Sequence, residues 1–270
     1  MMNNSTASVR AASLGLSDNG VSFGDDAIVA HEILSNAVSA GGTADTDTAN
    51  GCKVKLCGLR REQDVDAALA AGADAVGFII DVPQSHRSIS VERAAGLVKY
   101  MKTRSGKTGV KLPDAVGVFV DEPTERVAAI ANDADLDVIQ LHGHEDESYL
   151  AELRGLADVP IMQAFKIRAE SDVDRARQSS ADLVLLDAGA GDGKTFDWSL
   201  VRDVNRPFLL AGGLNAGNVT EAIRAVHPFG VDISSGTETN GVKDPHKMRA
   251  VVEVVRAAAD GAEGGGAHGS

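Results

Sequence analysis

Apolar runs alternate with amphipathic segments along most of the chain. Each run spans five to eight residues, and its nearly continuous apolar character is typical of a strand buried on both faces of a parallel sheet. A segment with apolar positions at helical spacing follows each run, as REQDVDAALAAG (61–72) follows KVKLC (53–57). The other runs are DAVGFII (74–80), AVGVFV (115–120), DVIQLH (137–142), PIMQAFKI (160–167), DLVLLDA (182–188), PFLLAGG (207–213) and VDISSG (231–236).

Eight such strand–helix units lie between residues 53 and 260. Eight consecutive units favour a closed barrel over an open, doubly wound sheet. An internal echo also favours a barrel, because an Asp directly precedes the second, fourth and sixth strands, as Asp74, Asp137 and Asp182. We therefore expect an α/β protein built as a single (β/α)8 TIM barrel with a flexible N-terminal extension.

The composition changes outside the expected barrel. Residues 1–52 are rich in Ser, Asn, Asp, Ala, Gly and Thr, and GGTADTDTANG (41–51) is typical of a linker. The sequence therefore predicts a poorly ordered extension over 1–52, a catalytic barrel over 53–260 and a flexible tail over 261–270. Within the barrel, MKTRSGKTGVKLPD (101–114) is interpreted as a polar insertion before the third strand.

Charge narrows the classes of partner. Asp and Glu number 39 against 26 Lys and Arg, and the net charge of −13 argues against a nucleic-acid-binding surface. The carboxylates recur on the outward faces of the predicted helices, which suggests an acidic surface of the halophilic type and a high-salt cytoplasm as a plausible setting.

Apolar runs and cysteines narrow the location. No run reaches the roughly 18 apolar residues of a membrane span, and no secretory signal is recognised, so we expect a cytoplasmic protein. Cys52 and Cys57 lie at the two ends of one predicted strand. That spacing suits neither a disulfide framework nor a Cys-x-x-Cys motif, so each cysteine is treated as a single thiol.

The barrel hypothesis places chemistry at the carboxyl ends of the strands. Two glycines, Gly212 and Gly213, follow the seventh strand, and Ser234, Ser235 and Gly236 follow the eighth. Glycines permit close backbone approach, and free N–H groups before a helix attract anions. Either loop alone could be only a tight turn, but together they predict a phosphate site.

Two further residues at strand ends could carry acid–base chemistry. Asp187 follows four apolar residues, and partial burial could keep its carboxyl protonated near neutral pH; the alternative is a solvated loop Asp. Cys57 ends the first strand before Gly58 and could act as a thiolate, although a small buried hydrophobe is the more common role of a lone cysteine.

The remaining polar residues at strand ends are less decisive. Arg87 could pair with a substrate carboxylate or be an exposed loop arginine, and the sequence leaves both open. His142 is expected to pack or make polar contacts at the rim. It and its neighbours lack ligand partners at metal spacing, so no metal site is predicted.

These motifs resemble phosphoribosylanthranilate isomerases, enzymes of tryptophan biosynthesis. The resemblance covers about residues 53 to 256 and rests on VKLCGL, SHRSIS, VGVFVDEP, DVIQLHG, LLDAGAGDGKTFDW, LLAGGLNAGNV and GVDISSGTETNGVKD. It implies a cofactor-free enzyme, monomeric or homodimeric, that binds a small phosphoribosyl substrate and carries out an Amadori rearrangement. The product would be 1-(2-carboxyphenylamino)-1-deoxyribulose 5-phosphate, formed from N-(5'-phosphoribosyl)anthranilate.

The same resemblance implies roles for individual residues. Asp187 would be the general acid and Cys57 the general base, while Arg87 would hold the anthranilate carboxylate. The phosphate would be held around the loop positions named above, and His142 would contribute to substrate binding. Two alternatives stay open: a related histidine-pathway isomerase, expected to carry a carboxylate in place of Cys57, and a non-catalytic phosphosugar-binding barrel. Two departures from the family pattern, Ser88 after Arg87 and the loop GAGDGKTF (189–196), leave ring contacts and loop closure open.

Overall fold

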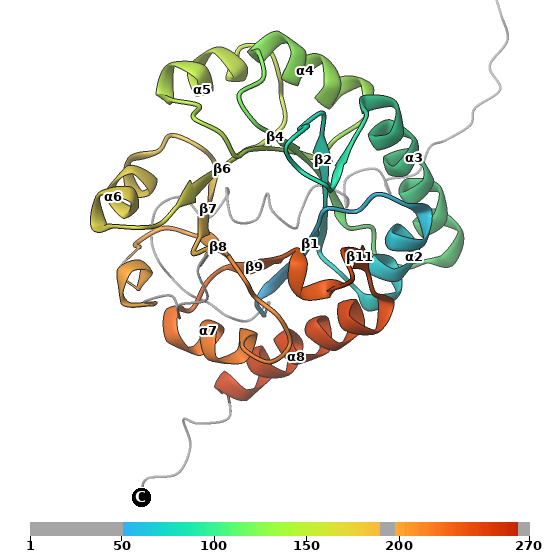
Figure 1. The fold of residues 1–270 in the computed structure, drawn as a ribbon, viewed down its shortest axis with the longest axis vertical. Helices are drawn as coiled ribbons and strands as arrows, with labels where there is room; N and C mark the ends of the chain where they lie inside the picture. Colours follow the sequence, from blue (N-terminus) through green and yellow to red (C-terminus); the bar gives the residue numbers. More distant parts are fainter. Residues whose placement is uncertain (1–50, 190–197, 203, 264–270) are drawn as a thin grey trace, which may run out of the picture.

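The chain forms a closed barrel of eight parallel strands surrounded by helices (Figure 1). The structure is a computed structural model that describes residues 51–189, 198–202 and 204–263. Neighbouring strands follow the order β1-β9-β8-β7-β6-β5-β4-β2, and pairing of β1 with β2 closes the ring. The strands are β1 (Lys53–Cys57), β2 (Ala75–Ile80), β4 (Asp114–Phe119), β5 (Val138–Leu141), β6 (Ile161–Lys166), β7 (Leu183–Asp187), β8 (Phe208–Ala211) and β9 (Gly230–Ile233).

Seven α-helices cover the barrel in the described part of the chain. They are α2 (Glu62–Ala71), α3 (Val91–Thr108), α4 (Thr124–Asp133), α5 (Glu147–Arg154), α6 (Glu170–Gln178), α7 (Val219–Val226) and α8 (Pro245–Glu263). A short strand, β3 (Ser88–Ile89), extends the edge of β2, and a small hairpin of β10 (Glu238–Thr239) and β11 (Val242–Lys243) follows β9. The TIM-barrel prediction is confirmed.

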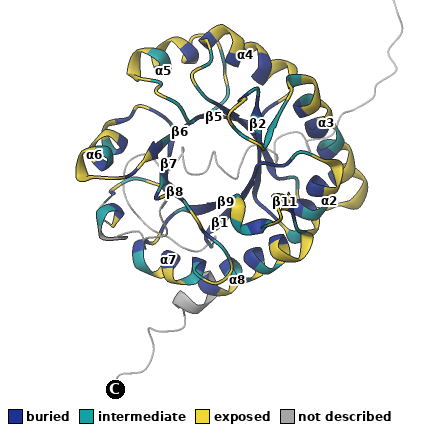
Figure 2. Cartoon of the chain, viewed as in Figure 1, coloured by how far each residue is buried: buried dark blue, intermediate teal, exposed yellow. Residues whose placement is uncertain are grey.

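Strand register divides the side chains between two apolar cores. The smaller core fills the barrel interior with residues such as Val116, Met162, Leu185 and Leu209. The larger core lies between the strands and the helices, where Phe78 is fully buried. Figure 2 shows the strands buried and the helices exposed on their outer sides. Burial on both faces explains why the strand sequences are nearly continuous in apolar residues.

The repeated aspartates link adjacent strands by hydrogen bonds near the N-terminal ends of the strands. A carboxylate oxygen of Asp74 accepts the Val54 N–H at 2.8 Å, and Asp182 accepts the Ile161 N–H at the same distance. Asp137 accepts the N–H of Ala115 at 2.7 Å. The repeated Asp in the sequence therefore has one structural role, because each carboxylate accepts a backbone N–H of the neighbouring strand.

Three expectations about boundaries change. The supposed polar insertion 101–114 mostly continues α3, which runs to Thr108 before Gly109 ends it in the left-handed conformation at φ 66°. Its Lys, Arg and Met residues are good helix formers, so polarity marked an exposed helix rather than a loop. Helix α8 reaches Glu263, beyond the expected barrel end at 260.

The unit after β7 also differs from the expected strand–helix pair. The described chain there holds only a 3-10 turn, Trp198–Val201, instead of an α-helix. Pro207 lies six residues after the turn, and a proline disfavours the α conformation in the residue before it, so a regular helix is not expected to continue as far as residue 206. Residues 1–50 of the extension expected over 1–52, the loop residues 190–197, and residues 264–270 of the tail expected over 261–270 lie outside the described residues.

Candidate active site

Polar side chains replace apolar ones where the barrel interior approaches the carboxyl ends of the strands. Register pairs Lys55 with Ala75 and Asp232, and Cys57 with Gly77, so these positions share the interior face. Asp187 shares that face, because register pairs it with the interior residue Ala211 on β8. The barrel thus brings Cys57 on β1 and Asp187 on β7 to opposite walls of one mouth.

Cys57 is enclosed and lies against a buried ion pair. Its side chain is 6% exposed, and the neighbouring Lys55 Nζ lies 3.0 Å from Asp232 Oδ1. Burial raises the pKa of the Cys57 thiol, while the charge and hydrogen bond of Lys55 act in the opposite direction. The net effect raises the pKa of Cys57, which favours the thiol over the thiolate.

Asp187 is held by His142 and by its own loop. The Asp187 Oδ2 atom lies 3.5 Å from His142 Nε2, and its Oδ1 atom accepts the Gly189 N–H at 2.9 Å. On the far side of the imidazole, Gln140 Nε2 lies 3.4 Å from His142 Nδ1.

These contacts reverse the protonation expected for Asp187. Burial raises its pKa, but the His142 hydrogen bond and charge, the Gly189 N–H and the charge of Lys166 outweigh burial, and the net pKa lies below the usual value. The structure therefore does not support the expectation that partial burial keeps this carboxyl protonated. Sequence could not weigh the effect, because His142 reaches Asp187 only through the fold.

The loops after β8 and β9 pack directly on each other. A side chain at Gly236 would collide with the carbonyl oxygen of Leu214. Gly212 lies so close to the loop after β7 that a Cβ would be 2.5 Å from the Gly189 nitrogen. Gly212 and Gly213 also have positive φ, at 104° and 65°. The glycines therefore serve close backbone approach as well as turning.

This packing exposes backbone donors. Among the described residues, the N–H groups of Gly213, Ser235 and Gly236 have no acceptor. Ser234 differs, because its hydroxyl donates to the Cys57 carbonyl at 3.1 Å and so links this loop to β1. The free N–H groups form a cradle suited to an anion.

Arg87 is neither free nor fully exposed. Its Nε and Nη2 atoms lie 2.6 and 2.9 Å from the two carboxylate oxygens of Glu238. Lys243 Nζ lies 3.0 Å from the same carboxylate and 2.7 Å from the Ser234 carbonyl oxygen. Glu238 and Lys243 are nearly buried, at 8% and 2% side-chain exposure. The network connects Arg87 with the anion cradle.

Gly58 explains the Cys-Gly pair in the sequence. Its φ is 81°, and a Cβ there would lie 2.6 Å from Arg87 Cδ and 3.3 Å from Ser234 Oγ. The aliphatic part of Arg87 therefore crosses the backbone directly after Cys57. Only glycine provides both the conformation and the space.

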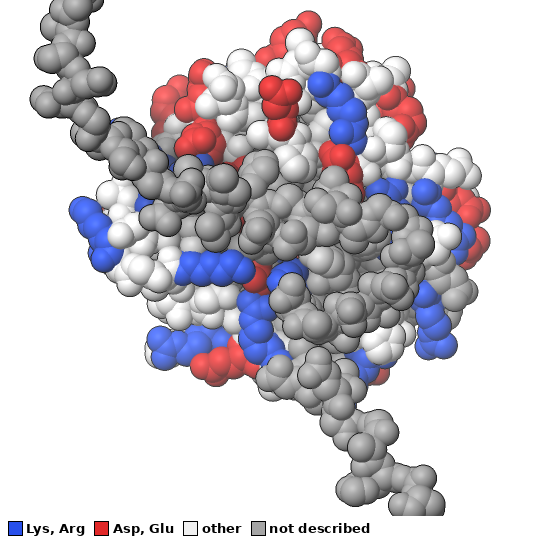
Figure 3. Space-filling view, turned by 180° about the vertical axis from the view of Figure 1, so that it is seen from behind, with Lys and Arg blue, Asp and Glu red and all other residues white. Residues whose placement is uncertain are grey.

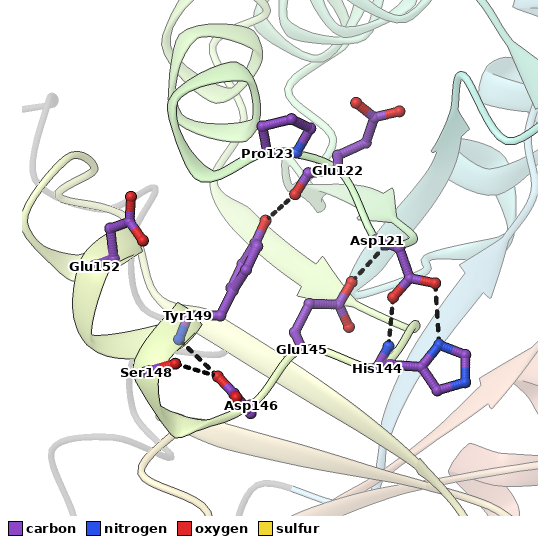
Figure 4. Close-up of a pocket in the computed structure, with 9 residues that line it drawn as sticks. All are labelled: Asp121, Glu122, Pro123, His144, Glu145, Asp146, Ser148, Tyr149 and Glu152. Carbon is purple, nitrogen blue, oxygen red and sulfur yellow. Dashed lines mark hydrogen bonds and ion pairs between the residues drawn. The ribbon is translucent and has the colours of Figure 1, made fainter.

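An acidic hollow lies at the mouth near the ends of β4 and β5 (Figure 4). Its Asp121 carboxylate contacts the backbone N–H and the ring of His144, while the Tyr149 hydroxyl donates to the Glu122 carbonyl oxygen. Carboxylates dominate its lining, so it would repel a phosphate. The lining residues are Asp121, Glu122, Pro123, His144, Glu145, Asp146, Ser148, Tyr149 and Glu152.

The surface charge gives no sign of a nucleic-acid-binding face. On the face shown in Figure 3, the described residues include both acidic and basic side chains, and the basic ones do not form a broad continuous area. No group of His, Cys, Asp and Glu in the described ranges has the arrangement of a metal site. No helix among the described residues is long and apolar enough to span a membrane.

The fold and this mouth define the class of the protein: a (β/α)8-barrel enzyme with an anion cradle in its last two loops and a thiol facing a carboxyl. The family model of N-(5'phosphoribosyl)anthranilate (PRA) isomerase matches residues 54–254. The isomerase of Thermoanaerobacter sp. (strain X514) is 38% identical over 211 residues, 76% of this chain and 98% of the relative. That of Dechloromonas aromatica is 41% identical over 215 residues, 76% and 97% of the two chains.

Solved structures agree with the sequence relatives. The phosphoribosylanthranilate isomerase of Thermotoga maritima matches with a TM-score of 0.68 and 34% identity, over 76% of this chain and 99% of that one. Another isomerase, solved with reduced 1-(o-carboxyphenylamino)-1-deoxyribulose 5-phosphate, matches at 0.65 and 34% identity, over the same shares. The chain belongs to the phosphoribosylanthranilate isomerase family and is an isomerase of tryptophan biosynthesis.

The sequence left a related histidine-pathway isomerase open as an alternative. The family match favours phosphoribosylanthranilate isomerase instead. It does not support a halophilic origin, since the relatives named here carry no such indication. Four charged residues at the mouth were missed by sequence reasoning: Lys55, Asp232, Glu238 and Lys243. The available signal was a lysine and an aspartate inside otherwise apolar strands, which is unusual for a barrel interior.

Proposed function

We propose that the chain rearranges N-(5'-phosphoribosyl)anthranilate with Asp187 as general acid and Cys57 as general base. Asp187 donates a proton to the furanose ring oxygen, the C1'–O bond breaks, and the amino nitrogen supplies electrons to form an iminium. Cys57 then removes the C2' proton to give an enolamine, which tautomerises to the ketone. The observation that supports this assignment is the interior position of both residues on opposite walls of the mouth.

The two groups must hold one proton between them in a particular arrangement. The raised pKa of Cys57 and the lowered pKa of Asp187 favour that proton on Cys57, whereas the reaction needs it on Asp187. The reactive form is thus a minor arrangement of the same total charge, and the pair titrates as a unit. A plot of kcat/KM against pH should therefore show a plateau. The ionisation of Asp187 should set the fall on the acidic side, and that of Cys57 the fall on the basic side.

Binding is proposed to use both ends of the network around Arg87. The N–H groups of Gly213, Ser235 and Gly236, with Gly212 beside them, hold the phosphate. Arg87 presents its remaining guanidinium N–H groups to the anthranilate carboxylate, because Glu238 occupies only Nε and one edge of Nη2. His142 contributes at the rim beside Asp187.

A fluorescence assay of phosphoribosylanthranilate consumption tests the roles. Cys57→Ser and Asp187→Asn should each lower kcat by about 100-fold or more, the scale of acid–base groups. Cys52→Ala is the matched control: Cys52 is the other buried thiol, located before β1, and should leave kcat unchanged. Undiminished turnover in Asp187→Asn would exclude the acid role, and a folded but inactive parent chain would favour a phosphosugar-binding protein.

The cellular setting is also proposed. Both described cysteines are free thiols, which suits the cytoplasm, where thiols stay reduced. The chain is proposed to act as a monomer or a homodimer. A dimeric relative from Thermotoga maritima has also been solved as monomers, and light scattering would distinguish the two states for this chain.

A further inference from the structure

A charged lysine lies inside the barrel beside the thiol. Lys55 is 1% exposed, among the least exposed of the large side chains in the described chain, and its ammonium pairs with Asp232. Replacing a buried ion pair by apolar side chains of similar volume is often neutral or stabilising, so stability is a weak explanation for this pair. Many other interior positions, such as Val116 and Leu185, carry apolar side chains.

Geometry directs the ammonium toward the thiol. Lys55 and Cys57 are two residues apart on one strand and therefore point to the same face. Opposite them, a Cβ at Gly77 would lie 2.6 Å from Cys57 Sγ and 3.1 Å from Lys55 Nζ. The absent side chain of Gly77 leaves one small space into which both groups extend. There the Lys55 ammonium donates a hydrogen bond to the Asp232 carboxylate at 3.0 Å and lies beside the Cys57 sulfur.

We propose that Lys55 is a positioning residue whose ammonium, anchored by Asp232, stabilises the Cys57 thiolate during proton removal. This inference rests on the proposed role of Cys57 as general base. In the enclosed mouth water cannot solvate a thiolate, so a fixed cation must replace that solvation. Lys55 is held in place before the reaction begins, which avoids the cost of reorganising a flexible side chain.

The other charged groups around the thiol are consistent with this role. Asp232 on β9 opposes the thiolate, while Lys243 on β11 and Arg87 before β3 favour it. Lys243 and Arg87 share Glu238 as counterion, which reduces their effect on Cys57. Lys55 exerts the largest favourable effect, and burial does not neutralise it, because Asp232 and Cys57 raise its pKa.

The test compares removal of the whole ion pair with removal of the cation alone. In a Cys52→Ala background, the pKa of Cys57 is measured from thiolate ultraviolet absorbance, with Cys57→Ser subtracted as blank. Lys55→Met combined with Asp232→Asn removes both charges, so no unpaired charge is left inside the barrel. The thiol pKa should rise relative to the parent chain, because Lys55 acts on Cys57 more strongly than Asp232 does. Lys55→Met alone retains the opposing carboxylate, so the thiol pKa should rise further, by about one unit or more.

Kinetics provide the second measurement. The basic limb of kcat/KM should move with the thiol pKa, and the plateau should fall about tenfold for each unit by which that pKa rises. An unchanged thiol pKa in the folded double variant would overturn the proposal. If that variant does not fold, a thiol pKa in Lys55→Met that is unchanged or lowered would do so. The absorbance measurement needs no turnover, so it remains decisive even if the proposed reaction is not observed.

Discussion

The guanidinium of Arg87 donates two hydrogen bonds to the carboxylate of Glu238, one from Nε and one from Nη2. Arg87 lies in the loop after β2, and Glu238 lies in the hairpin after β9. These residues are 151 positions apart in the sequence. The pair lies next to Gly58 and the anion cradle, so it connects the proposed carboxylate-binding and phosphate-binding parts of the mouth.

Loosening this pair should weaken substrate binding. Glu238→Gln removes the charge that fixes the Arg87 guanidinium plane, so KM for phosphoribosylanthranilate should rise roughly 10-fold while kcat changes little. Steady-state kinetics measure both constants. A lower KM in this variant would instead show that Glu238 competes with the substrate for Arg87.

Glu238 should also contribute to stability in acid. Burial raises its pKa, but Arg87 and Lys243 together lower it from 4.5 to about 2. A lowered folded-state pKa stabilises the fold above the unfolded value, and the stabilisation is lost as the pH falls from about 4.5 through about 2. Solvent screens these charges in part, so the contribution is on the order of 1 kcal/mol at neutral pH.

Urea unfolding at several pH values measures this effect. Glu238→Gln should be less stable than the parent chain at pH 7, and the difference between the two should shrink as the pH falls from 5 to 2. A constant difference across that range would contradict the assignment.

His142 should set the acidic limb of activity. His142→Ala removes the hydrogen bond and charge that lower the pKa of Asp187, so that pKa should rise. Below the Asp187 pKa both members of the pair are protonated, and the base is lost. The acidic limb of kcat/KM should therefore move to higher pH in the variant. A limb that stays in place would show that another group controls it.

The cradle should be sensitive to a single methyl group. Gly236→Ala places a Cβ against the Leu214 carbonyl, which is backbone and cannot turn aside. The loops must separate, so KM should rise at least about 10-fold, with loss of inhibition by inorganic phosphate. Gly96→Ala, on the exposed side of α3 where a Cβ meets nothing within 4 Å, is the matched control.

The control variant should keep its kinetic constants and gain roughly 0.5 to 1 kcal/mol of stability, because alanine restricts the unfolded chain and favours the helix. Equal kinetic effects in the two variants would contradict a specific role for the contact between the loops.

Local patterns predicted the elements well and their lengths less well. Apolar runs such as DLVLLDA identified each barrel strand, since burial on both faces requires apolar side chains in succession. The polar stretch after Met101 was misjudged, because an exposed helix and a loop share a polar composition. The turn at Trp198–Val201 was predicted as a full helix, since sequence spacing does not show how much room the fold leaves.

Candidate site residues were found where position along a strand was sufficient. Cys57 and Asp187 end strands, and parallel strands direct those ends to one mouth. Their protonation could not be predicted, since it depends on Lys55, Asp232, His142 and the depth of burial.

The sequence by itself determined the barrel, the positions of its strand ends and the family, because these depend on residue types at local spacing and on motif order. Only the tertiary structure decided which charges meet. Lys55 and Asp232 are 177 positions apart, yet they touch because β1 and β9 are neighbours in the closed ring. Electrostatic energy depends on distance and burial in space, which barrel closure creates and no local pattern encodes.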